Sequence, residues 1–303
     1  MNVLCRRQAN FSEEQKQQRP GLFHGTFRGA DFREKGEAAL RWGIIQWDVQ
    51  RRMEENLHQV EHGLQTTALD VAVLPEMCLS GYLFQDAAHL AQAAREAPLF
   101  LEALEALSRQ YDCAIIAGLP RQEGKRVYNS AAVVDAARCL GFYDKLHLSD
   151  LEKKLFTPGE KNRVFTIRGV TVGVSICFDL WFPEVYREQT RMGAQLFCCP
   201  VNFGGPQTLS VAAVRAMENA APLVLCNRTG TERMENIQAD FRGESGVFSS
   251  FGQRLTPKAT GFLAVGAELS FPAVRGNVIC RDLLAEVRRH EPIHTNKVGD
   301  KTT

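Results

Sequence analysis

The chain has 303 residues, of which 45% are hydrophobic and 23% charged, and its formal net charge is +1 at pH 7. This composition is typical of a soluble globular protein that buries a large core, in one large domain or two ordinary ones. The near-zero net charge gives no reason to expect nucleic acid or an anionic membrane as a partner, and no apolar run approaches the roughly 20 residues that span a bilayer.

The first 40 residues are polar, rich in Gln, Arg and Glu, and contain no apolar run. That composition argues against a secretory signal peptide, and the acidic residues Glu13 and Glu14 argue against an organelle transit peptide. We therefore expect residues 1–40 to form a poorly ordered extension, followed by one folded domain over 41–270 and a C-terminal helix and tail over 271–303. Neither a Pro/Ser/Gly-rich linker nor an internal repeat divides the chain.

From Trp42 onward, short apolar runs alternate with segments of helical periodicity, such as the apolar stripe of Met53, Leu57, Val60 and Leu64. The predicted strands are 42–47, 70–74, 114–118, 127–134, 139–144, 164–167, 170–176, 195–200, 222–227, 246–251 and 262–266, and the predicted helices are 50–68, 91–111, 184–192, 208–221 and 281–290. Early strands alternate with helices, whereas those between 127 and 176 follow one another directly. This mixture predicts an α/β fold with a mixed sheet, or two packed sheets, and helices outside.

The nine cysteines are scattered, and several fall inside apolar runs, where a reduced cysteine behaves as a small hydrophobe. These are Cys113, Cys198, Cys199 and Cys226. No C-x-x-C pair indicates a zinc knuckle or a redox centre, and disulfide frameworks are typical of short secreted chains. We therefore expect a reducing, cytoplasmic environment.

Glu76, Lys145 and Cys177 each lie at or just past the end of a predicted strand, where the active sites of α/β proteins gather. A thiol between a strand and a helix can face a substrate while its neighbours are packed. Free backbone N–H groups and the helix dipole would also favour its thiolate.

These three residue types together can perform nucleophilic catalysis. A thiol is mostly protonated at neutral pH, so Cys177 needs a base, and a shielded Glu76 carboxylate could take its proton. Lys145 and the backbone N–H of Phe178 would stabilise the oxyanion that forms on attack at a carbonyl. The expected intermediate is a thioester, which water activated by the same Glu76 would hydrolyse. Each residue alone is also typical of a structural role, as a buried cysteine or a surface charge.

The stretches around these residues are Leu74-Pro75-Glu76-Met77-Cys78-Leu79-Ser80-Gly81-Tyr82, Tyr143-Asp144-Lys145-Leu146-His147-Leu148 and Ile176-Cys177-Phe178-Asp179-Leu180-Trp181-Phe182-Pro183-Glu184. In order and separation they resemble the nitrilase superfamily of carbon–nitrogen hydrolases. Further similarity occurs in Phe156-Thr157-Pro158-Gly159, Arg215-Ala216-Met217-Glu218-Asn219 and Asn227-Arg228-Thr229-Gly230. The resemblance covers about residues 42–270. It implies an α-β-β-α four-layer sandwich, a single domain of two packed mixed sheets flanked by helices.

The resemblance also implies roles for individual residues. Glu76 would be the general base, Lys145 the oxyanion stabiliser and Cys177 the nucleophile of a Glu-Lys-Cys triad. Glu152 matches a supporting glutamate that orients the lysine and substrate; its alternative is a carboxylate on a helix surface among lysines. Arg215, Glu218 and Asn219, spaced i, i+3 and i+4 on a predicted helix, are expected to hold the architecture.

The implied function is hydrolysis of linear, non-peptide C–N bonds, without a metal or cofactor. Amides are favoured over nitriles because Phe178-Asp179 follows the cysteine, where nitrile-hydrolysing members tend to have Trp-Glu. The candidate pocket residues are Tyr82, Trp181, Asn202 and Phe203, with Phe182 beside them. The substrate stays open among an aliphatic amide, an N-carbamoyl amine, an ω-amide and a deaminated peptide. A homodimer or higher homo-oligomer is implied, formed through the outer helices.

Other functions fit parts of the sequence but not the whole. His58-Gln59-Val60-Glu61-His62 spells the H-x-x-E-H zinc-peptidase pattern, but the helical wheel turns both histidines away from the apolar stripe and toward solvent. A catalytically weak pseudoenzyme or assembly subunit could share the fold, although a scaffold has no need of Glu76, Lys145 and Cys177 together. A glutamine-amidase domain would need a synthetase that about 33 residues after 270 cannot supply. Acyl transfer to a lipoprotein would need membrane spans.

Overall fold

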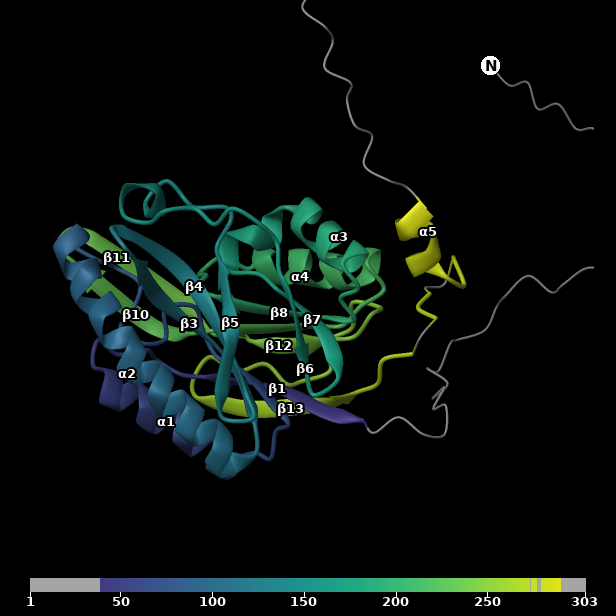
Figure 1. Ribbon diagram of the computed structural model, residues 1–303, viewed down its shortest axis with the longest axis horizontal. Helices are drawn as coiled ribbons and strands as arrows, with labels where there is room; N and C mark the ends of the chain where they lie inside the picture. The colour runs from purple at the N-terminus through teal and green to yellow at the C-terminus, as the bar shows by residue number, and fades with distance from the viewer. Residues whose placement is uncertain (1–38, 273, 277–278, 290–303) are drawn as a thin grey trace, which may run out of the picture. The chain divides into compact units, whose positions relative to one another are not determined.

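The computed structural model describes residues 39–272, 274–276 and 279–289. The extension expected over 1–40 lies almost wholly outside the described residues, and so does the tail beyond 289. Within the described part, two β-sheets lie between two layers of helices (Figure 1). The predicted α-β-β-α sandwich of two packed mixed sheets is therefore confirmed.

The first sheet has six strands, and its centre is parallel. Its order is β13 (Leu263–Leu269), β1 (Leu40–Gln46), β2 (Val71–Val73), β3 (Ala114–Glu123), β4 (Arg126–Asp135) and β5 (Arg138–Asp144). Strands β1, β2 and β3 run parallel, whereas β13 at one edge and the β3–β4–β5 meander at the other pair antiparallel. This arrangement brings the carboxyl ends of β2 and β5 to the same edge of the sheet.

The second sheet repeats this plan with five strands. Its order is β12 (Gly246–Phe248), β9 (Leu223–Asn227), β8 (Leu196–Val201), β7 (Val170–Val174) and β6 (Val164–Ile167). Its centre, β7–β8–β9, is parallel, and both edge strands are antiparallel. A separate hairpin of β10 (Thr229–Met234) and β11 (Ile237–Arg242) follows β9.

Three apolar clusters hold the layers together. Between the sheets, Ile44 and Val73 of the first pack with Val172 and Val224 of the second. Helices α1 (Met53–Thr66) and α2 (Ala87–Tyr111) cover the outer face of the first sheet, and α3 (Pro183–Arg191) and α4 (Gln207–Glu218) cover that of the second (Figure 1). The short α5 (Leu283–Arg289) contacts α3. None of the described helices is long and apolar enough to cross a membrane.

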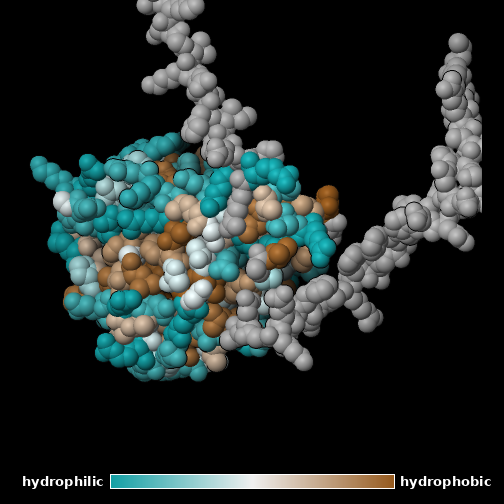
Figure 2. Space-filling view, turned by 45° about the vertical axis from the view of Figure 1, so that its right-hand side comes forward, coloured by the Kyte–Doolittle hydropathy of each residue, from teal (hydrophilic) through white to brown (hydrophobic). Residues whose placement is uncertain are grey.

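Side chains of apolar type also reach the surface. Figure 2 shows them gathered in a band between two more hydrophilic regions of one face. Among the exposed apolar side chains, Val214 and Met217 of α4, together with Phe251 and Leu255, are each more than two-fifths exposed.

Each predicted strand and helix corresponds to one in the structure, with ends that differ by a few residues. The hairpin β10–β11 is the exception, because no strand is predicted for residues 229–242. Its two strands pair with each other, apart from one bridge between Thr229 and Asp48, and are mostly polar. A half-buried strand alternates apolar and polar residues, and that signal is missing here.

Candidate active site

Three strand ends converge on one site. Glu76 follows β2, Lys145 directly follows β5, and Cys177 opens the short 3₁₀ helix η3 (Cys177–Trp181) after β7. Asn202, just past β8, joins two of these ends: its Nδ2 donates to the Glu76 carbonyl at 3.0 Å, and its own carbonyl lies 3.6 Å from the Cys177 Sγ. The structure thus brings together the three residues that the sequence singled out.

A buried ion cluster forms the floor of the site. The Lys145 Nζ donates to Glu76 Oε1 at 2.8 Å and to Glu152 Oε1 at 2.7 Å. The three side chains are only 1%, 0% and 2% exposed, respectively. Glu152 opens the 3₁₀ helix η2 (Glu152–Lys154) and is buried. The alternative prediction, a carboxylate on a helix surface among lysines, is therefore wrong. An ammonium has three N–H donors, so Lys145 keeps one for a further acceptor.

The two carboxylates differ in their remaining partners. Glu152 Oε2 accepts the backbone N–H of Ser149 at 2.9 Å. Glu76 Oε2 is buried and receives no hydrogen bond from any residue that the structure describes. On both residues the other oxygen, Oε1, also accepts from the Asn129 side chain. Glu76 therefore has one fixed oxygen and one free lone-pair acceptor.

These environments move the two glutamate pKa values apart. Burial raises the pKa of Glu76, and the negative charge of Glu152 adds to the rise, although Lys145 and Asn129 oppose it. Burial acts in the same direction on Glu152, but Lys145 and the Ser149 N–H outweigh it, so the pKa of Glu152 is lowered. Burial disfavours the charged form of Lys145 as well, yet the two carboxylates raise its pKa well above the usual value. When neighbouring groups are split in this way, the raised one is suited to exchange protons and the lowered one to stay charged.

The surroundings of the Cys177 thiol favour its protonated form. Its removal from water and the nearby Glu76 charge raise its pKa well above the usual value, and Lys145 only partly offsets them. A thiol of this kind reacts only when a base removes its proton as it attacks. Its backbone φ of 46° lies in the left-handed region, which a non-glycine residue adopts at a cost that is typical of functional sites.

Asp179 fixes the turn that carries the cysteine. Its buried carboxylate accepts the Ile176 N–H at 3.1 Å, the Tyr143 hydroxyl at 2.9 Å and the His147 N–H at 2.8 Å. No described residue accepts the Phe178 N–H, which stands at the amino end of η3. A backbone donor is therefore free beside the Cys177 sulfur.

Arg215 holds the other end of η3, as the architectural role predicted for it requires. Its Nε donates to the Leu180 carbonyl at 2.9 Å, and a second nitrogen donates to the Trp181 carbonyl at 3.3 Å. A 2.9 Å contact with Glu218 one turn along α4 holds the guanidinium in place. The carbonyls that a helix end leaves unpaired are thereby satisfied.

The predicted pocket residues have different environments. The Tyr82 hydroxyl lies close enough to the ion cluster for Lys145, Glu76 and Cys177 to act on its pKa, which burial raises well above the usual value. Asn202 is buried and contacts the site as described. Trp181 is 46% exposed at the end of η3, whereas Phe203 is buried in the apolar cluster behind the second sheet.

A further buried carboxylate, which the sequence did not indicate, anchors the loop of Tyr82. Glu232 of β10 accepts the backbone N–H groups of Tyr82 and Leu83 at 2.9 and 3.1 Å and pairs with Arg228. A Cβ at Gly81, where φ is +85°, would lie 2.7 Å from a Glu232 oxygen. The position of Tyr82 therefore depends on the β10–β11 hairpin, which was not predicted from the sequence. The only local signal was the position of Glu232, two residues after the matched stretch Asn227-Arg228-Thr229-Gly230.

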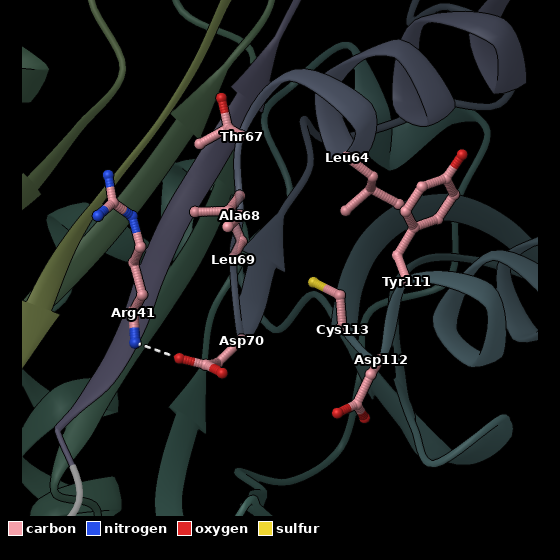
Figure 3. Close-up of a pocket in the computed structure, with 9 residues that line it drawn as sticks. All are labelled: Arg41, Leu64, Thr67, Ala68, Leu69, Asp70, Tyr111, Asp112 and Cys113. Atoms are coloured by element: carbon pink, nitrogen blue, oxygen red, sulfur yellow. Dashed lines mark hydrogen bonds between the residues drawn. The ribbon is translucent and has the colours of Figure 1, made fainter.

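Two other features lie apart from this site. His58 and His62 are exposed, as the helical wheel predicted, and Glu61 accepts the Tyr111 hydroxyl. A pocket of about 280 Å³ lies at the amino ends of β2 and β3, the opposite edge from Glu76, and Figure 3 shows the side chains around it. The residues that line it are Arg41, Leu64, Thr67, Ala68, Leu69, Asp70, Tyr111, Asp112 and Cys113.

The raised pKa of Glu76 and the lowered pKa of Glu152 predict that replacing the two residues changes stability in opposite directions. A raised folded-state pKa means that ionising Glu76 costs stability as the pH rises, so at pH 7 Glu76→Gln should increase the unfolding free energy, by about 1 kcal/mol. A lowered pKa means that Glu152 adds stability at pH 7 that is lost as the pH falls, so Glu152→Gln should decrease it, by about the same amount. Urea unfolding of both variants at pH 7 measures the two shifts. Shifts of the same sign would contradict this assignment.

Comparison with known proteins adds to the geometry. Residues 38–261 match the family model described as carbon-nitrogen hydrolase. A nitrilase from Pyrococcus abyssi is 36% identical over 166 residues, or 54% of this chain and 63% of that protein, which is less than two thirds of its length. A probable nitrilase from Schizosaccharomyces pombe is 32% identical over 211 residues, 67% of this chain and 75% of that one. The crystal structure of a carbon-nitrogen hydrolase from Helicobacter pylori shares the fold, with a TM-score of 0.74, 21% identity and coverage of 83% and 93%.

Proposed function

The chain belongs to the carbon-nitrogen hydrolase family, and from this premise we propose that it is an amidase-type hydrolase of linear, non-peptide C–N bonds, acting through a thioester on Cys177. One observation carries the proposal. The carboxylate of Glu76 has an unbonded oxygen in a buried ion cluster with Lys145, and the charges of both act on the Cys177 thiol. Base, cation and nucleophile are the parts that acyl transfer requires.

In the acylation step, Glu76 Oε2 takes the thiol proton while the Cys177 Sγ attacks the amide carbonyl carbon. The raised pKa of Glu76 brings its basicity closer to that needed at neutral pH. The tetrahedral intermediate then collapses: the C–N bond breaks, the Glu76 carboxyl returns its proton to the leaving nitrogen, and ammonia or an amine departs. A thioester remains on Cys177.

Two donors would stabilise the oxyanion of this intermediate. The third N–H of Lys145 is not used by Glu76 or Glu152, and the Phe178 N–H is free at the start of η3. Donors that are already oriented in a water-poor site stabilise developing charge more than water does. Glu152, whose lowered pKa keeps it charged, holds Lys145 in its protonated state.

Deacylation reverses these roles. Water enters where the amine left, Glu76 takes one of its protons, and the hydroxide attacks the thioester carbonyl. The C–S bond breaks, the sulfur regains its proton from the Glu76 carboxyl, and a carboxylic acid is released. Every proton transfer runs through Glu76, so the cycle needs no metal or cofactor.

Amides are the preferred substrate class. Phe178-Asp179 after the cysteine supports this choice, with Tyr82, Trp181, Asn202 and Phe203 proposed around the pocket. Relatives of this chain include an (R)-stereoselective amidase from Pseudomonas sp, an N-carbamoylputrescine amidase from Solanum lycopersicum and a 2-oxoglutaramate amidase from Bacillus subtilis. Hydrolysis of an N-carbamoyl amine or of a nitrile on the same triad is the alternative.

We also propose a homodimer or higher homo-oligomer in a reducing compartment such as the cytoplasm. The exposed apolar side chains Val214 and Met217 of α4 support association through the outer helices. Seven of the described cysteines are free thiols, and five of these are buried, which supports a reducing environment; the seven are Cys78, Cys113, Cys139, Cys177, Cys198, Cys199 and Cys226.

A small substrate panel tests the reaction class. The purified protein should release ammonia from at least one of four compounds: an aliphatic amide, an N-carbamoyl amine, an ω-amide and a deaminated peptide. A nitrile of the same carbon skeleton as the best amide should react more slowly. Cys177→Ala protein, run in parallel, corrects for ammonia from other sources. Release from the nitrile alone, or from none of the compounds, would contradict the proposed reaction.

A further inference from the structure

Asn129 occupies an unusual place in the ion cluster. It lies on β4, is fully buried, and its Nδ2 donates to Glu76 Oε1 at 2.7 Å and to Glu152 Oε1 at 2.8 Å. These are the same two oxygens that the Lys145 Nζ bridges. Two donors, one charged and one neutral, therefore link the same pair of carboxylates.

The main chain fixes this amide relative to the lysine. The Asn129 carbonyl accepts the Lys145 N–H at 2.9 Å, which continues the β4–β5 ladder past the end of β5. On its other side, Asn129 pairs with Pro120 of β3. A residue held between two strand neighbours has little freedom to move, so its amide can serve as a fixed support for the two carboxylates.

The charge of the cluster explains why a neutral donor suits this position. Glu76 and Glu152 carry two negative charges when ionised, and Lys145 supplies one positive charge. A second cation here would lower the pKa of Glu76 and weaken it as a base at neutral pH. A third carboxylate would repel the two already present. An amide supplies hydrogen bonds without altering the net charge.

The other end of the same side chain has no structural use that is visible in the described part of the chain. Asn129 Oδ1 is buried and meets no donor there. A buried acceptor without a partner lowers stability, and such costs are found where function requires a particular group.

We infer that Asn129 is a positioning residue for the proposed reaction: its amide holds Glu76 Oε1 in the ion cluster and so keeps Oε2 available for the Cys177 proton. The inference rests on the proposed function. Hydrogen bonds to an ionised carboxylate favour that form, and Asn129 accordingly acts to lower the pKa of Glu76 against the effect of burial. Without the amide, Glu76 would hold its proton to a higher pH.

Alkylation of Cys177 by iodoacetamide tests this without knowledge of the substrate. In that reaction the Sγ–C bond forms, iodide leaves, and the thiol proton passes to Glu76. The rate is followed from pH 5 to 9 by peptide mass spectrometry, which separates Cys177 from the other cysteines. The variants are Asn129→Ala, Asn129→Asp and Glu76→Gln. Ser130→Ala serves as matched control, because it removes the hydrogen bond from a buried side chain of the same strand to Asp144 without touching the cluster.

Asn129→Ala should slow alkylation about ten-fold at the acid end of the range, the effect of losing one charged hydrogen bond. The deficit should shrink as the pH rises, because Glu76 then ionises even without the amide. Asn129→Asp has nearly the same shape but adds a third carboxylate, so it should slow alkylation more than Asn129→Ala does near neutral pH. Ser130→Ala should follow the wild-type profile.

A loss for Asn129→Ala that is equal at every pH, or no loss, would overturn the inference. If the alanine variant does not fold, a wild-type profile for Asn129→Asp overturns it instead. The Glu76→Gln variant separates this failure from that of the proposed function. If Glu76→Gln alkylates at the wild-type rate at every pH, the proposed base is wrong. If Glu76→Gln is slow while both Asn129 variants match the wild type, only the role of Asn129 is wrong.

Discussion

Replacing Cys177 with alanine is expected to lower amide turnover at least about 10⁴-fold, because the acyl-enzyme route loses the atom that forms it. Binding and oxyanion donors alone leave only a small residual rate. The fold should persist, since Cys177 is a partly buried side chain on a turn that Asp179 and Arg215 hold by other contacts. Turnover is measured by ammonia release on the best substrate of the panel, and folding by thermal unfolding.

Cys139→Ala is the matched control for that experiment. Cys139 is also a partly buried free thiol, but it lies near the start of β5, at the opposite end of that strand from Lys145. It should keep turnover close to the wild-type value. A Cys177→Ala protein that retains a tenth of the wild-type turnover would remove the nucleophile from this mechanism.

Replacing Lys145 with methionine is expected to lower kcat about 10²- to 10³-fold, or roughly 3 kcal/mol in the acylation barrier, as the loss of an oxyanion donor does elsewhere. The substitution also leaves the Glu76 and Glu152 carboxylates buried without their cation. Leaving buried charges with no counter-ion costs about 3–5 kcal/mol, so stability should fall as well. Both quantities must be measured: kcat at a temperature where the variant is folded, and the free energy of unfolding.

The exposed Lys153→Met variant separates a specific effect from a general loss of charge. Lys153 lies on the same short helix as Glu152 but forms only a surface ion pair with Asp150. Such pairs contribute little, about 0–1 kcal/mol, so its kcat and stability should match the wild type. A merely two-fold loss of kcat for folded Lys145→Met would refute the oxyanion role.

The sequence predicted the site well where a reactive side chain comes directly after a predicted strand. Glu76, Lys145 and Cys177 each come after an apolar run, and the carboxyl ends of such strands meet at one edge of the sandwich. Periodicity alone located nearly every element, because buried parallel strands and amphipathic helices leave strong local patterns. Local signals were enough for these features.

Partners that depend on long-range contacts could not be predicted. Asn129 lies 53 residues from Glu76 and 23 from Glu152, and nothing around it in the sequence indicates that it bridges them. Glu232 lies about 150 residues from the loop that it fixes, on a polar hairpin without a strand pattern. The contacts of both residues form only in the folded chain, where the two sheets and the hairpin lie together.

The sequence left two roles open for Glu152, supporting glutamate or surface carboxylate, for a similar physical reason. Its neighbours Lys153 and Lys154 are charged and made a solvent-facing helix surface reasonable. In the structure the three residues form one short turn, in which the lysines face water while Glu152 points inward to Lys145. The direction of a single short turn is set by the tertiary fold, and sequence periodicity cannot reveal it.

The most direct test of the central claim is the mass of the enzyme during turnover. Acid quenching of the wild-type protein with its best amide, followed by intact-mass and peptide analysis, should reveal the acyl group of the substrate on the peptide that contains Cys177. Added hydroxylamine should remove the adduct as the hydroxamate. An active enzyme whose acyl group is found on another residue would contradict the account.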